Sequence, residues 1–321
     1  MLADIARPGH ANQAIGTAEA LGLPFDLKPL QWGPLARLPN ALLGGSLAGL
    51  TPSSAERLAL PWPDLVIAAG RRTAPVARWL RARSGCRCAQ LMWPGSSAGL
   101  DLVIVPVHDR AAGRSDVSTI RAAPHRLTPG KLADAAATLA QELESLPRPW
   151  LACLVGGARA GVRFGVDEAA LLAQQASRLA EGVGGSLLVV TSRRTGEAMG
   201  RVLRSALSVP HRIFAPDTPF EVYAGVLGMA DELIVTADSA SMLAEACAVG
   251  RPVRLFRPPQ WRLGKLDRLH AALAGWLRPL DAPVRPESLP RLDSGGEAAA
   301  LVRRLLDDPA PSPHMWRRGA H

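Results

Sequence analysis

The stretch Pro63-Asp64-Leu65-Val66-Ile67-Ala68-Ala69-Gly70-Arg71-Arg72-Thr73 contains the clearest strand and turn of the chain. A short apolar run that ends at a turn residue is typical of a buried strand in a parallel sheet. Residues 73–83 then continue with a helical pattern. The order strand, turn, helix is the repeating unit of an α/β fold, so this stretch predicts the fold class.

The same order recurs along the chain. Residues 100–106 form another apolar strand in the first half. In the second half, predicted strands alternate with predicted helices: strands at 150–155, 186–191 and 232–236, and helices at 167–182, 196–206, 220–230 and 239–249. This alternation predicts two Rossmann-like, doubly wound α/β domains, an architecture like that of two-lobed GT-B proteins.

A chain of 321 residues is longer than one typical domain. A predicted helix at 132–146 ends at Pro147-Arg148-Pro149, a pair of prolines that does not fit inside a helix or strand. The domains are therefore predicted at 1–146 and 147–321, with a last helix at 297–307. At the start, a short strand is expected before a loop at residues 6–13 and a helix at 14–21, and long loops are expected over residues 32–63.

The charge balance does not predict a nucleic-acid partner. The net charge is +9, but lysine occurs only at Lys28, Lys131 and Lys265, and the arginines are scattered. A DNA-binding face would gather them, and the sequence contains no signature of a nucleic-acid-binding module. Attraction to anionic small molecules or lipid headgroups stays open.

The cysteines and the hydropathy pattern indicate a cytoplasmic protein. Cys153 and Cys247 lie in apolar runs, and Cys86-Arg87-Cys88 lacks the second ligand pair that a zinc site needs. No metal site is predicted, and a reducing compartment is the simpler inference. We expect no signal peptide and no transmembrane segment, while peripheral contact with the inner face of a membrane stays open.

Two loops share one tripeptide. Arg71-Arg72-Thr73 and Arg193-Arg194-Thr195 each follow an apolar strand and precede a helix. Ligands of open α/β sheets bind beyond the carboxyl ends of the strands, where forked arginine donors and helix N-termini attract phosphate. The alternative is that each threonine caps its helix and the arginines are solvated surface.

A third loop, Thr236 to Glu245, ends a strand in small hydroxyl residues and opens a helix that carries an acid. Ser239 and Ser241 suit a diphosphate, and Glu245 suits the hydroxyls of a ribose. The alternative is an ordinary capped helix with an acidic first turn.

His10 follows Gly9 at the expected end of the first strand, where an imidazole can act as a general base. The alternative is an inert loop histidine. No cofactor is predicted: Gly156-Gly157-Ala158-Arg159-Ala160-Gly161 has the wrong spacing for a dinucleotide fingerprint, and Tyr223 is followed by Leu227 where sugar epimerases that use NAD have lysine.

Several short motifs in one order resemble the plant "elongated mitochondria" fission-factor family and its bacterial homologues. They are 9–13 (GHANQ), 63–73, 105–106 with 108–110, 123–126 (APHR), 154–157 (LVGG), 191–195 (TSRRT), 238–246 (DSASMLAEA) and 250–253 (GRPV). The resemblance implies a fold similar to metal-independent two-lobed glycosyltransferases, with an acceptor side in the first lobe and a donor side in the second. The chain departs from it at Ala158-Arg159, where the family has Ser-Lys, and at Thr218-Pro219-Phe220, where it has Asn-Pro-Tyr.

These observations predict a glycosyltransferase-like protein that binds a nucleotide diphosphate-sugar in the cleft between its lobes and transfers the sugar to an envelope or lipid-linked acceptor. His10 is the predicted catalytic base. The predicted substrate-binding residues are Gly9, Asn12, Gln13, Gly70, Arg71, Arg72, Thr73, Gly156, Gly157, Ser192, Arg193, Arg194, Thr195, Asp238, Ser239, Ser241, Met242 and Glu245. Two alternatives remain: a non-catalytic, membrane-associated adaptor on the same fold, and a sugar-nucleotide epimerase that uses no NAD.

Overall fold

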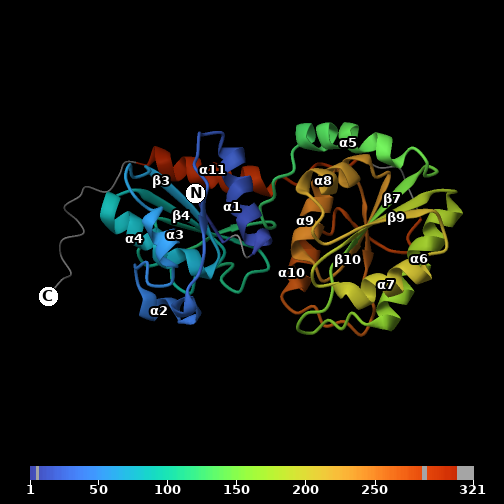
Figure 1. The fold of residues 1–321 in the computed structure, drawn as a ribbon, viewed down its shortest axis with the longest axis horizontal. Helices are drawn as coiled ribbons and strands as arrows, with labels where there is room; N and C mark the ends of the chain where they lie inside the picture. Colours follow the sequence, from blue (N-terminus) through green and yellow to red (C-terminus); the bar gives the residue numbers. More distant parts are fainter. Residues whose placement is uncertain (5–6, 284–287, 309–321) are drawn as a thin grey trace. The chain divides into compact units, whose positions relative to one another are not determined.

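A computed structural model describes residues 1–4, 7–283 and 288–308 of the chain (Figure 1). The chain divides into two compact units. Unit 1 is Met1–Arg126 together with the segment that begins at Asp293, and unit 2 is Leu127–Leu292.

Unit 1 is built on a six-stranded sheet with the order β2-β1-β3-β4-β5-β6. All neighbouring strands pair in parallel. The strands are β1 (Leu2–Asp4), β2 (Lys28–Leu30), β3 (Leu65–Ala69), β4 (Arg87–Leu91), β5 (Leu102–Pro106) and β6 (Ser118–Ile120). The helices are α1 (Pro8–Leu21), η1 (Pro34–Arg37), α2 (Asn40–Leu43), α3 (Pro52–Glu56), η2 (Arg71–Thr73), α4 (Ala74–Ser84) and α11 (Ser294–Asp307).

The strand β3 shows why this sheet is buried on both faces. Ile67 and Ala69 belong to a core cluster shared with α1 and α11, whereas Val66 and Ala68 belong to a second cluster shared with α4. Successive side chains of a strand point to opposite faces, so a continuous apolar run is what a sheet covered on both sides requires.

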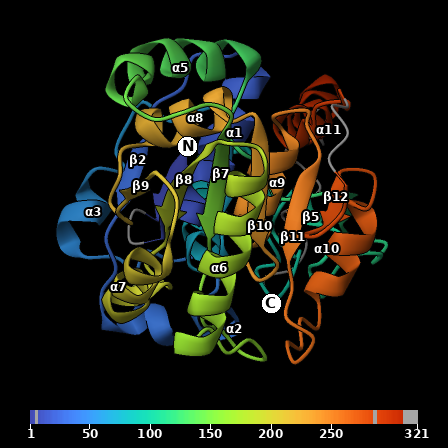
Figure 2. The same ribbon diagram turned by 90° about the vertical axis from the view of Figure 1, so that its right-hand side faces the viewer.

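Unit 2 is built on a second parallel six-stranded sheet, with the order β12-β11-β10-β7-β8-β9 (Figure 2). Its strands are β7 (Trp150–Val155), β8 (Ser186–Thr191), β9 (His211–Phe214), β10 (Glu232–Thr236), β11 (Val253–Phe256) and β12 (Leu277–Pro279). Its helices are α5 (Pro129–Leu143), α6 (Val166–Gly182), α7 (Gly196–Ala206), α8 (Phe220–Met229), α9 (Ala240–Cys247) and α10 (Leu266–Ala272). Two parallel sheets flanked by helices confirm the predicted fold class.

The division between the units differs from the predicted boundary at residue 147. Helix α5 packs on α8, and a Cβ atom at Gly225 or Gly228 would lie 2.7 Å from the carbonyl oxygen of Ala135 or 2.4 Å from that of Leu132. The two helices therefore approach at their backbones, and α5 belongs to unit 2 (Figure 1). Two glycines without side chains make this close packing possible.

The end of the described chain returns to unit 1. Helix α11 packs beside α1 in Figure 1, and its Ala298, Ala299 and Val302 join the core of unit 1. Arg303 also donates to the carbonyl oxygens of Ala20 and Leu21 at the end of α1. The predicted second domain of residues 147–321 is therefore wrong at both ends.

The first helix corrects a second expectation. It begins at Pro8 and not at residue 14, so His10 to Gln13 are helical and do not form a loop. Proline suits the first turn of a helix because its missing N–H would have no partner there. The region 32–63 contains the short helices η1, α2 and α3. The strands β2, β4, β6, β9, β11 and β12 and the helix α10 were not predicted.

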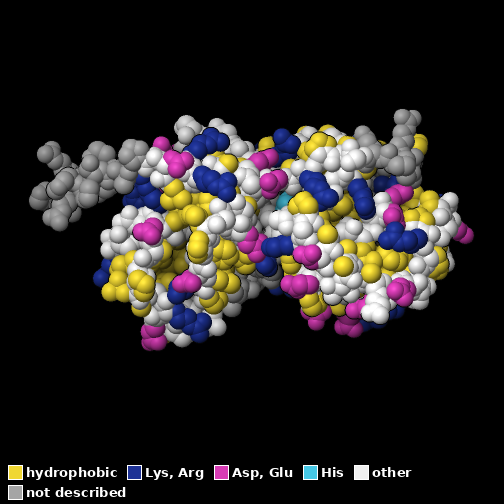
Figure 3. Space-filling model, turned by 90° about the horizontal axis from the view of Figure 1, so that it is seen from above, with side chains coloured by type: hydrophobic (Ala, Val, Ile, Leu, Met, Phe, Trp, Pro, Cys, Tyr) yellow, Lys and Arg dark blue, Asp and Glu magenta, His cyan; other side chains and the backbone are white. Residues whose placement is uncertain are grey.

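The surface agrees with the expected scatter of charge. On the face drawn in Figure 3, lysine and arginine side chains are interspersed with acidic and apolar ones and form no single basic face. In the part of the chain that the structure describes, no helix is both long enough and apolar enough to cross a membrane.

Candidate functional site

Three loops of unit 2 meet at one edge of its sheet. Strands β10, β7 and β8 are neighbours and run in parallel, so the loops that follow them lie side by side. These loops are residues 156–165, 192–195 and 237–239. The carboxyl edge of a parallel sheet is where ligands of this fold class bind.

Asp238 joins the three loops. Its side chain is fully buried, and Oδ2 accepts hydrogen bonds from the Gly157 amide at 3.0 Å and from the Arg194 guanidinium. Arg194 also donates to the Gly157 carbonyl oxygen at 2.9 Å, and Arg159 donates to the Asp238 carbonyl oxygen at 3.1 Å. Asp238 and Arg194, both predicted to bind substrate, are therefore tied to each other.

Gly156 and Gly157 make this arrangement possible. A Cβ atom at Gly156 would lie 2.3 Å from Asp238 Oδ2, and one at Gly157 would lie 2.1 Å from the Arg194 carbonyl oxygen. Gly157 also has a φ of +154°. Any side chain at either position would displace the neighbouring loop.

Ser192 and Thr195 hold the second loop to the first. The Ser192 hydroxyl donates to the Gly156 carbonyl oxygen at 2.5 Å, and the Thr195 hydroxyl contacts the same oxygen at 2.6 Å. Thr195 makes no side-chain cap to α7. The interpretation that this threonine caps its helix is therefore wrong, and its hydroxyl joins two loops.

The turn into α9 leaves its hydroxyl groups unused. Ser239 is the N-cap residue but makes no side-chain cap, so the ordinary capping interpretation is also wrong here. Ser239 is buried, Ser241 is exposed, and neither hydroxyl has a hydrogen-bond partner among the described residues. Met242 is buried in the first turn of the same helix. Since the first N–H groups of a helix also lack intrahelical partners, this turn is a cluster of donors.

Glu245 lies farther along α9. Its Oε2 accepts a hydrogen bond from the Tyr223 hydroxyl at 2.7 Å. Burial raises the pKa of Glu245 to about 7, and the bond from Tyr223 opposes part of that rise. Burial also raises the pKa of Tyr223, with the Glu245 charge as a further cause. A carboxyl group held in this way can accept hydrogen bonds from a diol when it is ionised.

Three arginines of unit 2 differ in how they are used. Arg193 is exposed and has no hydrogen-bond or ion-pair partner among the described residues, unlike Arg194 beside it. Arg159 is half-buried next to Asp238, and burial lowers its pKa, with the Arg194 charge as a second cause. Arg193 is therefore the freer cation of the predicted pair.

In unit 1, His10 lies in the first turn of α1 against Gly70. A Cβ atom at Gly70 would lie 2.6 Å from His10 Nδ1, and Gly70 has a φ of +89°. Burial lowers the pKa of His10, Arg7 lowers it further, Asp4 raises it and Arg72 again lowers it. The imidazole is therefore neutral at pH 7, the state in which it can accept a proton.

The tripeptide Arg71-Arg72-Thr73 also has one bound and one unpartnered arginine, but in the reverse order of the second copy. Arg71 donates to the carbonyl oxygens of Leu38 at 2.6 Å and Ala36 at 2.9 Å, and to Asn40 Oδ1 at 3.2 Å. Arg72 has no hydrogen-bond or ion-pair partner among the described residues. Thr73 caps no helix and donates to the Gly70 carbonyl oxygen at 2.9 Å.

The remaining predicted residues of unit 1 are spread over α1. Gly9 is exposed, Asn12 is half-buried and Gln13 is buried. Gln13 Oε1 has no hydrogen-bond partner among the described residues.

Several residues beside the predicted ones, in one unit or the other, were missed by sequence reasoning. Asp4 is buried at the end of β1, with Oδ1 unpartnered in the described structure, and it lies close enough to His10 to affect its pKa. Arg159 was noticed only as a departure from the Ser-Lys of the similar family, and Tyr223 only because it lacks the lysine that follows in sugar epimerases that use NAD. Their roles depend on partners 79 and 22 residues away, which no local pattern reveals. Within the described ranges, no group of three or more His, Cys, Asp or Glu side chains is placed to hold a metal ion.

Each unit contains a parallel six-stranded sheet with candidate ligand-binding loops at its carboxyl edge. This pair of sheets defines a protein with the GT-B-like fold. A solved structure of the UDP-GlcNAc 2-epimerase from Methanocaldococcus jannaschii has this fold, with a TM-score of 0.55 at 13% sequence identity, over 95% of this chain and 98% of that one.

The sequence comparisons agree with one another. Residues 8–306 match the family described as "Mitochondrial fission ELM1". A mitochondrial fission protein ELM1 of Arabidopsis thaliana is 25% identical over 297 residues, 83% of this chain and 69% of the relative. An uncharacterized protein of Rickettsia prowazekii is 26% identical over 293 residues, 79% of this chain and 82% of the relative. The chain belongs to the mitochondrial fission ELM1 family, which confirms the resemblance predicted from its motifs.

Proposed function

We propose that the protein binds a nucleotide diphosphate-sugar through unit 2 and transfers the sugar to an acceptor. The observation that carries this proposal is the α9 segment: an unused hydroxyl at Ser239, free N–H groups in the first turn, and a carboxyl at Glu245 held by Tyr223. Helix α9 therefore offers a cluster of hydrogen-bond donors at its N-terminus and a hydrogen-bond acceptor, the carboxyl of Glu245, farther along.

The diphosphate would bind at the N-terminus of α9. The Ser239 hydroxyl and the helix N–H groups donate hydrogen bonds, and the positive end of the helix dipole favours an anion. Arg193 would supply a charge that no described residue of the protein neutralises. The same groups would stabilise the negative charge that develops on the leaving diphosphate.

The ribose would bind to Glu245. Glu245 lies six positions after Ser239, which corresponds to about 9 Å along a helix. A ribose joined to a diphosphate can span that separation. The Tyr223 hydroxyl occupies Oε2 and fixes the carboxyl, so a ribose diol would donate chiefly to Oε1.

His10 would be the base of the transfer. Its neutral imidazole can take the proton from the acceptor hydroxyl as that oxygen forms a bond to the anomeric carbon and the bond to the diphosphate breaks. The predicted acceptor is an envelope or lipid-linked molecule, and a peripheral position at the inner face of a membrane would give access to it.

The name of the structural neighbour supports uridine as the first nucleotide to test, because that enzyme acts on UDP-GlcNAc. Likeness of fold does not carry an activity across. An epimerase would change the free sugar nucleotide, and an adaptor would bind without turnover.

The first experiment measures thermal stabilisation by uridine, guanosine, cytidine and thymidine diphosphates and their sugars. A ligand at 100 times its Kd stabilises the folded state by about 2.7 kcal/mol, which raises the Tm by several degrees. Glu245→Ala and Arg193→Ala should lose the shift. The matched controls are Glu221→Ala and Arg204→Ala, which change exposed residues of α8 and α7 outside the site.

Each result has a separate meaning. A nucleotide-specific shift that both site variants lose supports the donor site, and loss of sugar transfer in His10→Gln supports the base. Conversion of the sugar nucleotide without an acceptor would replace transfer by epimerisation. Binding without any change of the sugar nucleotide or transfer to an acceptor would favour the adaptor, and no shift with any nucleotide would overturn the proposed donor site.

A further inference from the structure

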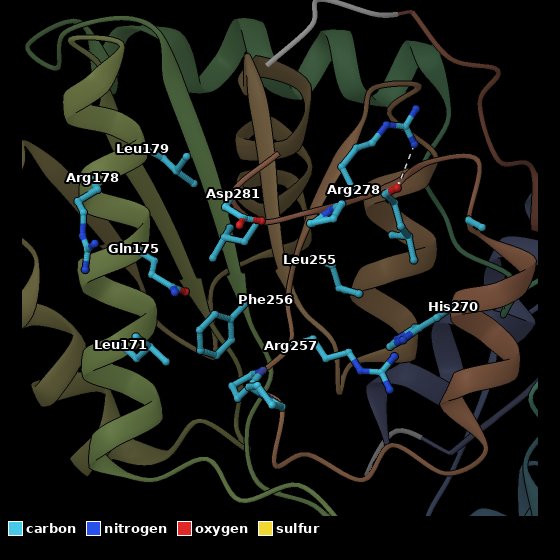
Figure 4. Close-up of a pocket in the computed structure, with 16 residues that line it drawn as sticks. Leu171, Gln175, Arg178, Leu179, Leu255, Phe256, Arg257, His270, Arg278 and Asp281 are labelled. Carbon is cyan, nitrogen blue, oxygen red and sulfur yellow. Dashed lines mark hydrogen bonds between the residues drawn. The ribbon is translucent and has the colours of Figure 1, made fainter. Parts of the chain in front are cut away.

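Unit 2 contains a cavity of about 740 Å³ between helices α6 and α10. Figure 4 shows side chains of both helices and of β11 around it. The described residues that line it include none of those assigned above to the nucleotide. Its volume is in the range of small-molecule binding sites, about 300–1,000 Å³.

The wall of the cavity is mainly apolar. Leu171 and Leu179 come from α6 and Leu255 from β11. Leu255 is half-buried although its neighbour Phe256 is buried, and Leu171 is 36% exposed. Because α10 has only seven residues, it leaves this part of the unit with apolar side chains in contact with solvent.

His270 gives the cavity one buried acceptor. Its Nε2 lies 3.0 Å from the Ala237 carbonyl oxygen. A carbonyl oxygen only accepts, so Nε2 carries the hydrogen and Nδ1 holds a lone pair. His270 is 8% exposed, and Nδ1 has no hydrogen-bond partner among the described residues.

The ring stays neutral because burial lowers the pKa of His270, although the bond to Ala237 opposes the shift. Figure 4 shows the ring projecting from α10 towards Arg257. A buried acceptor without a donor is costly, by about 1–3 kcal/mol. A ligand with an N–H or O–H group would satisfy it.

The rim of the cavity is basic. Arg178 is exposed on α6 and has no hydrogen-bond or ion-pair partner among the described residues. Arg257 pairs with Asp267 at 2.9 Å, and Arg278 donates to the carbonyl oxygens of Gly275 and Leu277. Among the described residues that line the cavity, Asp281 is the one that carries a carboxylate. Arg178 is thus the cation best placed for an anionic ligand.

We propose that this cavity binds an amphipathic organic anion: a ligand with an apolar ring body against the leucines, an N–H or O–H donor to His270 Nδ1, and one anionic group on Arg178. The site is separate from the proposed donor site and does not depend on nucleotide binding.

The probe for this site is 6-anilinonaphthalene-2-sulfonate, which carries an N–H group and a sulfonate at opposite ends of its ring body, as His270 and Arg178 lie on opposite sides of the cavity in Figure 4. Its neutral counterpart is N-phenyl-2-naphthylamine, which lacks only the sulfonate. Fluorescence titration of the full chain gives the affinity for each. We expect the sulfonate to bind the unsubstituted protein about two- to fivefold more tightly than the neutral amine.

The variants block or alter the site one group at a time. Ala274→Trp fills the cavity from its exposed rim, and the matched control Ala271→Trp changes an exposed residue of α10 that does not line it. The first should weaken binding at least about tenfold, and the second should not change it. Arg178→Gln should lower affinity for the sulfonate only. His270→Gln, which keeps a donor to Ala237, should lower affinity for both probes about five- to tenfold.

Equal titrations for Ala274→Trp and Ala271→Trp would place the probe elsewhere and overturn the site, as would the absence of binding to the unsubstituted protein. Equal affinity for the two probes would overturn its preference for an anion. Thermal melts of both tryptophan variants establish that each is folded.

Discussion

The Tyr223 hydroxyl donates to Glu245 Oε2 across 2.7 Å and links helix α8 to helix α9. Both side chains are only half-buried by exposed area, yet burial is the main cause of the raised pKa of each. The carboxyl group proposed to bind ribose therefore changes its charge near neutral pH.

This raised pKa predicts a pH-dependent loss of stability. The pKa of Glu245 is about 7 in the folded protein against 4.5 in the reference state. The protonated carboxyl contributes its full stabilisation below about pH 4.5, and this contribution to the free energy of unfolding is lost as the pH rises through 7. Relative to Glu245→Gln, the free energy of unfolding of the unsubstituted protein should fall by up to about 3 kcal/mol between these pH values.

Urea unfolding at pH 5 and pH 8 checks this prediction, with Glu197→Gln on the exposed face of α7 as the control. A difference in the free energy of unfolding between the protein and Glu245→Gln that does not change with pH would contradict it.

The raised pKa of Glu245 also predicts that nucleotide affinity should rise from pH 6 to pH 8, because the ionised carboxyl is the better acceptor.

The adjacent arginines of the second loop should behave differently. Arg194→Ala leaves the buried carboxylate of Asp238 without its cation, which costs about 3–5 kcal/mol for a fully buried pair. The Arg194 side chain is 38% exposed, so we expect about 2 kcal/mol. Arg193→Ala should change the free energy of unfolding by less than about 0.5 kcal/mol. Denaturant unfolding separates the two, and equal losses of stability would show that the pair is not divided in this way.

Gly157→Ala should be among the most destabilising small substitutions. Its methyl group would lie 2.1 Å from the Arg194 carbonyl oxygen at a φ of +154°. We expect a loss of about 3 kcal/mol or more from strain and displacement of the loop. Gly200→Ala is the matched control, because nothing lies within 4 Å of a Cβ atom there and the residue is inside α7. That substitution should stabilise by about 0.5–1 kcal/mol, and thermal melts that rank the two variants the other way would refute the loop geometry.

Arg71 should protect the segment that it holds. It donates to the backbone at Ala36 and Leu38, on either side of the exposed Arg37. Arg71→Ala should therefore speed tryptic cleavage after Arg37, by about tenfold if the local opening free energy falls by about 1.4 kcal/mol. Arg72→Ala should leave the rate unchanged. If both variants are cut at the rate of the unsubstituted protein, Arg71 does not stabilise this segment.

Sequence alone determined the repeating architecture and the family of this protein. Trp150–Val155 and Ser186–Thr191 were predicted to the residue, because an apolar run of strand length between turn residues is a local signal that a buried parallel strand requires. The loops that follow them were located for the same reason. The order of short motifs sufficed for the family, which the comparisons confirm.

Tertiary structure alone decided what each residue of those loops does. The two copies of Arg-Arg-Thr are identical in sequence, yet Arg71 is bound and Arg72 free in one, while Arg193 is free and Arg194 bound in the other. The partners are distant in the chain, so no local pattern distinguishes the copies. The domain boundary was misplaced for the same physical reason. The prolines after α5 are a local signal. The α8 glycines that let α5 pack closely in unit 2 lie some 90 residues further along the chain than α5.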